Sequence, residues 1–197
     1  MSKKYLGHPD YLINYVWWSL QMAIGSLTEI YHLSNPEEKS LLERHPFAFY
    51  RGALEYCFNA EYTKLTERKF DSKRPQENIA SIYRLNEATI DYTGDFQEQY
   101  EINRKAFNEL AKSDFFKRQW ALRNDKFSHA EASGNNRIFK DFELNTAEIK
   151  EGFSQLQVLL DISQTCSITV KHYVQRFYLP DIDTRTRDLF KTLSVHL

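Results

Sequence analysis

The residues with the clearest chemical potential lie in one short stretch, "LRNDKFSHAEAS", residues 122–133. Arg123 shares a helical stripe with three aromatic residues and is therefore expected to start from the core-facing side of a helix: Phe116, Trp120 and Phe127. A guanidinium keeps its charge, so it must pair internally, reach solvent along its aliphatic stem, or line a wet cleft that binds an anion. The internal alternative is an ion pair with Asp125 or with an acid on a neighbouring helix.

His129 supplies a second useful group, an imidazole that can exchange a proton near neutral pH. It follows Arg123 by six positions, so a straight helix would place it roughly 120° around the axis and roughly 9 Å further along. The two side chains then meet over one ligand only if the helix bends at its end or if a second copy of the chain faces the first. The alternative is a surface or helix-capping histidine.

This motif resembles the hallmark of the HEPN superfamily (higher eukaryotes and prokaryotes nucleotide-binding), especially its abortive-infection-like bacterial members. That hallmark is an Arg, a polar residue directly after it, and a His beyond four to six intervening positions; Arg123, Asn124 and His129 fit it with five intervening. The following loop and "LNTAEIKEGFSQLQVLLDIS", residues 144–163, are similar to the closing helix of that branch. A subset of members has a tyrosine two residues after the histidine, where this chain has Glu131.

The resemblance implies a helical bundle that commonly dimerises. Many members are metal-independent endoribonucleases of toxin or phage-defence systems, and others are noncatalytic RNA-binding or protein-interaction modules. In the catalytic case His129 would take the proton of an RNA 2′-hydroxyl, and Arg123 would stabilise charge on the attacked phosphate as a 2′,3′-cyclic phosphate end forms. Asn124 would orient the phosphate or the imidazole, and Asp125, four residues before His129, would hold the ring.

The charge distribution favours RNA near the motif. Residues 101–140 contain nine Lys or Arg and five Asp or Glu, a local charge of +4, whereas the whole chain has 26 against 27, or -1. We therefore expect modest, salt-sensitive affinity for RNA, with contacts from three nearby cations: Lys117, Arg118 and Lys126. DNA lacks the attacking hydroxyl, so no DNA specificity is expected. The expected partners are RNA, a second copy of the chain, and an antitoxin or other defence partner.

Other kinds of site find little support in the sequence. Glu29 and His32 have the spacing of a di-iron bundle, but the second such pair is missing and no HExxH is present, so no metal is predicted. The glycines are isolated, which argues against a phosphate-cradling loop, and no cofactor is predicted. Two distant cysteines and a longest apolar run of only Val16–Leu27 favour a cytoplasmic protein that does not enter a membrane.

The chain as a whole is predicted to be one all-α domain, residues 1–197. It has only six glycines and five prolines and few segments that alternate with period two. We expect long helices from Pro9, over about 47–70, after a Ser113 cap, and from Asn145 to about Phe177, with shorter helices near 79–90 and 97–111 and after about Thr184. Together with the resemblance, this pattern predicts an antiparallel four-helix bundle of HEPN type with short accessory helices.

The many aromatic side chains are expected to pack inside this bundle. They make up 15% of the chain and cluster in "YVWW", "FAFY" and "EYCFNAEY". In the first helix Leu20, Ile24, Leu27 and Tyr31 recur on one predicted core-facing stripe. A remaining alternative is that the aromatic interior binds a small ligand, for which the sequence offers no specific polar group.

Overall fold

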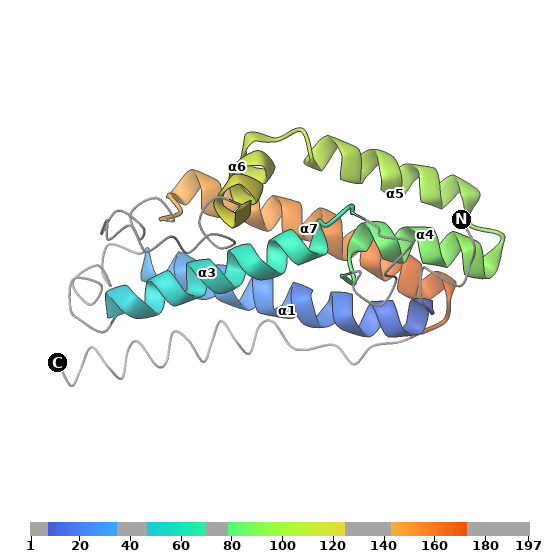
Figure 1. Ribbon diagram of the computed structural model, residues 1–197, viewed down its shortest axis with the longest axis horizontal. Coiled ribbons are helices and arrows are strands. Elements are labelled where there is room, and N and C mark those ends of the chain that lie inside the picture. The colour runs from blue at the N-terminus through green and yellow to red at the C-terminus, as the bar shows by residue number, and fades with distance from the viewer. Residues whose placement is uncertain (1–7, 35–46, 70–78, 125–142, 173–197) are drawn as a thin grey trace.

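The computed structural model is all-helical over the residues that it describes, which are 8–34, 47–69, 79–124 and 143–172 (Figure 1). These ranges contain six α-helices and no strand. The prediction of an all-α protein is therefore confirmed for the described part of the chain. Within that part, no helix is both long enough and apolar enough to span a bilayer.

Three long helices lie side by side along the molecule. They are α1 (Pro9–Leu33), α3 (Phe47–Leu65) and α7 (Thr146–Thr169), with 25, 19 and 24 residues. Helices α3 and α7 both run opposite to α1 and both pack against it (Figure 1). The described residues thus contain three long helices where the sequence predicted four.

Three shorter helices complete the described structure. They are α4 (Ile82–Thr93), α5 (Gln97–Leu110) and α6 (Asp114–Leu122). Helix α4 packs on α1 and α7, and α5 packs on α4 and α7. Helix α6, which leads into the Arg-His motif, packs on α3 and α7 (Figure 1).

Local capping residues explain where several helices begin and end. Ser81 and Ser113 each accept a hydrogen bond from a backbone N–H in the first turn of α4 and α6, respectively. Asn145 and Glu148 form the predicted reciprocal capping box at the start of α7. Gly94 ends α4 with a φ of 71°, a left-handed conformation that glycine adopts without steric cost.

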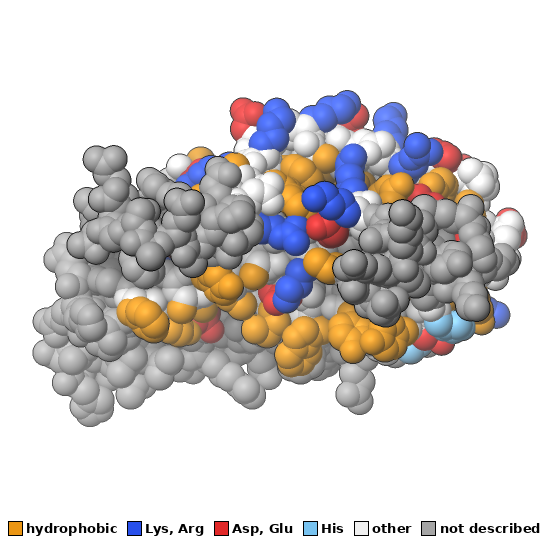
Figure 2. Space-filling model, viewed as in Figure 1, with side chains coloured by type: hydrophobic (Ala, Val, Ile, Leu, Met, Phe, Trp, Pro, Cys, Tyr) orange, Lys and Arg blue, Asp and Glu red, His pale blue; other side chains and the backbone are white. Residues whose placement is uncertain are grey.

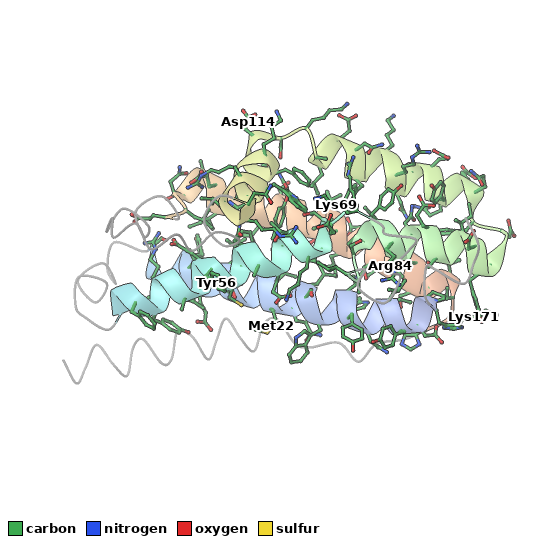
Figure 3. The ribbon with its side chains drawn as sticks, viewed as in Figure 1. Met22, Tyr56, Lys69, Arg84, Asp114 and Lys171 are labelled. Carbon is green, nitrogen blue, oxygen red and sulfur yellow. The ribbon has the colours of Figure 1, made fainter. Side chains whose placement is uncertain are left out.

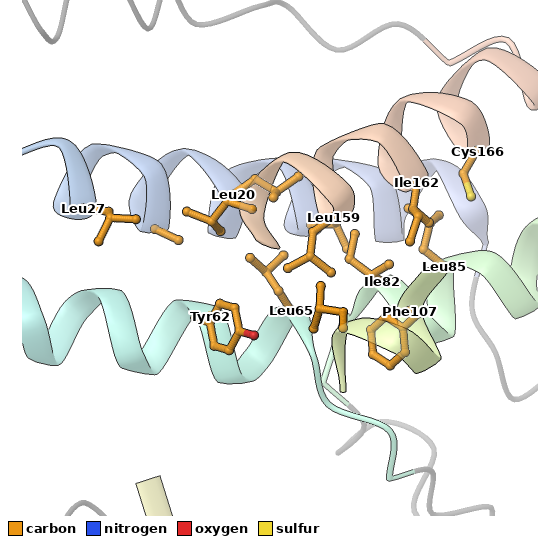
Figure 4. Packing of buried hydrophobic residues seen from close by; sticks show 14 of the residues in the cluster. Leu20, Leu27, Tyr62, Leu65, Ile82, Leu85, Phe107, Leu159, Ile162 and Cys166 are labelled. Atoms are coloured by element: carbon orange, nitrogen blue, oxygen red, sulfur yellow. The ribbon is translucent and has the colours of Figure 1, made fainter. Parts of the chain in front are cut away.

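The helices share one hydrophobic core, part of which is shown in Figure 4. Leu20 and Leu27 of α1 face Leu159 of α7 and Tyr62 of α3 across this core. The Tyr62 hydroxyl donates to the Gln155 side chain, so its polar end is satisfied inside the core. This shared core fixes the positions of α3 and α7, on which α6 rests.

Gly152 allows the close contact of α7 with its neighbours. A Cβ at this position would lie 2.9 Å from Leu27 Cδ2 and 3.3 Å from Phe115 Cζ. The missing side chain therefore lets α7 approach both α1 and α6 in the middle of a long helix.

Aromatic burial was only partly predicted correctly. Tyr31 is 49% exposed and Tyr50 is 39% exposed, although both were expected to face the core. The last turn of α1 buries Ile30 and Leu33 instead, and the Tyr50 hydroxyl donates to Glu29 at the surface. Successive helical residues are about 100° apart, so an aromatic run must place some of its rings outside.

Helix α7 also ends earlier than predicted. It stops at Thr169 rather than near Phe177, because Lys171 takes a positive φ of 58°. The His172 N–H then donates to the Ser167 carbonyl, and the Ser167 hydroxyl donates to the His172 carbonyl. These bonds satisfy the end of the helix without a further turn. Residues 173–197, with the helix predicted from Thr184, lie outside the described residues.

Candidate functional site

The predicted catalytic residues lie at and after the end of α6, and the structure describes two of the four. Arg123 caps α6 and Asn124 follows it, where the helix widens into a π-type turn. Such turns are uncommon and often occur at functional sites. Asp125, His129 and the predicted RNA contact Lys126 lie outside the described residues.

Arg123 is held by two contacts that come from different parts of the chain. Its Nη1 donates to Glu67 Oε2 at 2.8 Å, and Glu67 lies just after the end of α3. Its guanidinium stacks on the Trp120 ring at 4.6 Å, and the Trp120 indole N–H donates to Thr66 Oγ1 at 3.1 Å. The end of α6 is therefore fastened to the end of α3 through two adjacent residues, Thr66 and Glu67.

The Arg123–Glu67 pair resolves one of the alternatives left open by the sequence. The partner is an acid from another helix region, as one alternative proposed. The Glu67 side chain is 9% exposed, whereas the Arg123 side chain is 29% exposed. The carboxylate is thus nearly buried, while the guanidinium keeps a surface that solvent or an anion can reach.

The aromatic stripe around Arg123 lies at the edge of the core, where Phe116 packs against the buried cluster with its ring 6.4 Å from that of Tyr62. The core side of α6 is formed by Phe115, Gln119 and Leu122, which are buried. Phe116, Trp120 and Arg123 are intermediate in exposure and pack along the flank toward α3. The reason is that α6 lies across α3 and α7, so two adjacent sides of this short helix are covered.

The two predicted RNA-contacting residues within α6 have different environments. Arg118 forms an ion pair with Glu148 of α7, and its side chain is 31% exposed. Lys117 is 63% exposed and pairs with Asp114, which is labelled at the start of α6 in Figure 3. Lys117 is therefore available at the surface, while Arg118 ties α6 to α7.

A basic cleft adjoins this region and was not singled out from the sequence. It has a volume of about 550 Å³ and is lined by one face of α5, the turn after α5, and Arg68. Figure 2 shows Lys and Arg side chains gathered over α5 and continuing into the middle of this face. Its cations are Arg68, Arg104, Lys105 and Lys112, and its acids are Glu101 and Glu109.

The pKa of one acid in the cleft, Glu109, reflects the charges around it. The hydrogen bond and the charge of Lys112, together with the smaller effect of Lys105, lower the pKa of the Glu109 carboxyl. A lowered carboxyl pKa means that the surroundings favour negative charge. The shift reports the local pair with Lys112, and the net positive charge of the cleft comes from its four cations against two glutamates.

Two other kinds of site find no support in the described structure. Within the described ranges, no group of three or more His, Cys, Asp or Glu side chains could hold a metal ion. A hollow in the interior beside Ile82, Phe107 and Ile162 holds only about 10 Å³. That volume is no larger than one water molecule needs, so this hollow cannot take a small ligand without rearrangement.

Comparison of the chain with protein-family models, with curated proteins and with solved structures gives no match.

Sequence reasoning missed two parts of this site, Glu67 and the cleft. Glu67 is 56 positions from Arg123, and no local pattern connects them. The signal that could have found the cleft was present in the counted charge of residues 101–140, which includes Arg104, Lys105 and Lys112. Arg104 and Lys105 lie on one face of α5, and Lys112 lies in the turn that follows it.

Proposed function

We propose that this protein is a HEPN-type RNA-binding protein that cleaves RNA as a metal-independent endoribonuclease in a toxin or phage-defence system. The observation that carries the proposal is the placement of Arg123, which is oriented by Glu67 and Trp120 and is partly exposed. Lys117 and Arg118 precede it closely in the sequence, and Glu67 is followed directly by Arg68 of the basic cleft. A guanidinium held in this way needs little reorganisation to meet a phosphate.

The proposed reaction uses side chains of this chain and water, and it needs no metal ion. His129 removes the proton of a 2′-hydroxyl, and the 2′-oxygen forms a bond to the adjacent phosphorus. The bond from phosphorus to the 5′-oxygen breaks, the 5′-oxygen takes a proton from water, and a 2′,3′-cyclic phosphate remains. Arg123 stabilises the negative charge on the phosphoryl oxygens during these changes.

The other predicted residues have supporting roles in this proposal. Asn124, which is exposed, orients the phosphate or the imidazole, and Asp125 holds the His129 ring by a hydrogen bond. Lys117, Arg118 and Lys126 contact the RNA backbone. The protein acts in the cytoplasm as a homodimer, with an antitoxin or defence partner that restrains it.

The test of this function is incubation of purified protein with total RNA in the presence of a metal chelator. We expect wild type to cut, and both His129→Ala and Arg123→Ala to lose activity by about 100-fold or more. Arg51→Ala is the matched control, because it also removes the arginine of an ion pair with a buried glutamate, Glu55, away from the motif. Intact RNA after incubation with wild type, or equal cutting by all variants, would contradict the proposal.

A second candidate function is a noncatalytic RNA-binding or protein-interaction module. The Arg123–Glu67 ion pair favours it, because that pair gives Arg123 a structural purpose without any reaction. In this case Arg123→Ala lowers stability and wild type leaves RNA uncut. Arg123→Lys separates the two candidates, since a lysine can keep the pair with Glu67 but loses the planar fork that matches a phosphate.

A further inference from the structure

We infer that the basic cleft beside α5 binds the phosphate backbone of single-stranded RNA and leads the strand to Arg123. The inference rests on the proposed function in taking RNA as the ligand, but it assigns a binding site separate from the Arg-His motif. The residues that we assign to it are Arg68, Arg104, Lys105 and Lys112.

The first argument is the arrangement of charge along α5. Residues 101, 104, 105, 108, 109 and 112 all line the cleft, which is the pattern of one face of a helix and its following turn. Arg104 and Lys105 lie on α5, and Lys112 lies two residues beyond the end of this helix at Leu110. The cations therefore form a row and can contact successive phosphates of an extended strand.

Arg68 reaches the cleft from the segment after α3 and is held against α5. Its guanidinium lies over the Phe107 ring at 4.8 Å, and its Nη2 donates to Asn108 Oδ1 at 3.1 Å. Among the described residues Arg68 forms no ion pair with a carboxylate. The stacked guanidinium is thus held in place by neutral groups and keeps its full charge for an anion.

The two acids of the cleft do not prevent phosphate binding. Glu101 pairs with Arg104 at 3.7 Å, and Glu109 pairs with Lys112 at 2.7 Å. All four of these side chains are more than half exposed, so these pairs are weak and a phosphate can replace either glutamate. Four cations against two acids leave the lining with a formal charge of +2.

The position of the cleft favours RNA over an acidic protein as its ligand. Arg68 directly follows Glu67, the residue that holds Arg123. A strand lying along α5 and over Arg68 therefore continues toward the guanidinium proposed to act on the scissile phosphate. Binding of an acidic protein segment would not require such a path from the cleft toward Arg123.

Binding of a labelled single-stranded oligonucleotide, measured by fluorescence anisotropy over a salt series, tests the inference. The probe is a DNA strand, which has the phosphate backbone but cannot be cut through a 2′-hydroxyl. For the double variant Arg104→Gln, Lys105→Gln and for Arg68→Gln we expect about tenfold weaker binding, with a salt slope reduced by about 0.7 for each lost phosphate contact.

Three comparisons make the outcome decisive. Lys150→Gln, an exposed change on α7 that lies outside the cleft lining, is expected to bind within about twofold of wild type. His129→Ala is expected to bind the DNA strand normally, so a failure of the catalytic proposal leaves this result unaffected. Cleft variants that bind like wild type, or polyglutamate that competes as well as an oligonucleotide of equal charge, would overturn the inference. The second result would indicate an acidic protein partner.

Discussion

The ion pair between Arg123 and Glu67 gives Arg123 two compatible roles. It satisfies a charge at the edge of the core, and it holds a guanidinium that is partly exposed. The residue types at 123, 124 and 129 were sufficient to predict a candidate site. The partner Glu67 was not predictable, because it depends on how α6 crosses the end of α3.

Glu67→Gln is expected to destabilise the protein by about 1–3 kcal/mol, because it leaves the Arg123 charge without its nearly buried counterion. Urea unfolding measures this change. Glu109→Gln, which breaks the exposed pair with Lys112, serves as the control and is expected to leave the midpoint unchanged. Equal midpoints for Glu67→Gln and wild type would show that the pair contributes no net stability.

Glu55 is expected to make stability depend on pH. Desolvation by burial raises the pKa of its carboxyl, although Arg51 and the Leu144 N–H oppose the shift. The folded state therefore holds the proton more tightly than the unfolded state. This contribution to stability is fully present below the ordinary carboxyl pKa and is lost as pH rises through the raised, folded value.

The free energy of unfolding of wild type minus that of Glu55→Gln should therefore be larger near pH 4 than near pH 7. The amide introduced by this substitution does not titrate, so the difference isolates the Glu55 carboxyl. Chemical unfolding of both proteins across that range is the measurement. A difference that is constant or that grows with pH would show that the Arg51 pair outweighs desolvation.

Helix boundaries were predictable where a local capping signal sets them. The Ser113 cap and the Asn145–Glu148 capping box were both confirmed, and both depend on residues within one turn. The end of α7 was wrong by several residues, because it depends on the left-handed conformation of Lys171 rather than on a glycine or proline. The predictions of which helix face is buried near the end of α1 and the start of α3 were also wrong, because tertiary packing decides which side of a helix is covered.

Asn145→Ala is expected to destabilise the protein by about 1 kcal/mol through loss of the α7 cap. Thr146→Ala, an exposed change at the next position, controls for side-chain loss and should cost much less. Thermal or urea unfolding compares the two variants. An equal cost for both would mean that the capping box does not stabilise α7.

The outer face of α1 is the surface that we expect to mediate the proposed homodimer. It exposes a hydrophobic stripe at helical spacing, Tyr11, Tyr15, Trp18 and Met22, of which Met22 is seen on the outer side of the helix in Figure 3. The sequence has no charged residue between positions 11 and 28, which suits self-association more than an ionic partner.

Trp18→Glu should therefore shift the protein from dimer to monomer, because two copies would bring like charges into an apolar contact. Light scattering after size-exclusion chromatography reports the mass directly. Lys150→Glu, an exposed charge change on α7, is the control. A wild-type monomer, or a dimer that is unaffected by Trp18→Glu, would contradict this use of α1.

In the molecule as a whole, positive side chains are concentrated on one face although the net charge is small. The chain carries a formal charge of -1, yet cations collect over α5 and beside the end of α3 on one face (Figure 2). The local excess of positive charge was predictable from the sequence, but its concentration in a cleft required the packing of α5 against the rest. We expect RNA affinity to fall steeply with salt for the same reason.

The central claim is that Arg123 and His129 act together on an RNA phosphodiester. Its most direct test uses a short RNA that wild type cuts at one mapped position, compared with the same strand carrying a single 2′-deoxy nucleotide on the 5′ side of that position. The account predicts that the RNA gives a 2′,3′-cyclic phosphate end and that the substituted strand stays intact. Cleavage of the substituted strand, or products that end in a 3′-hydroxyl, would contradict it.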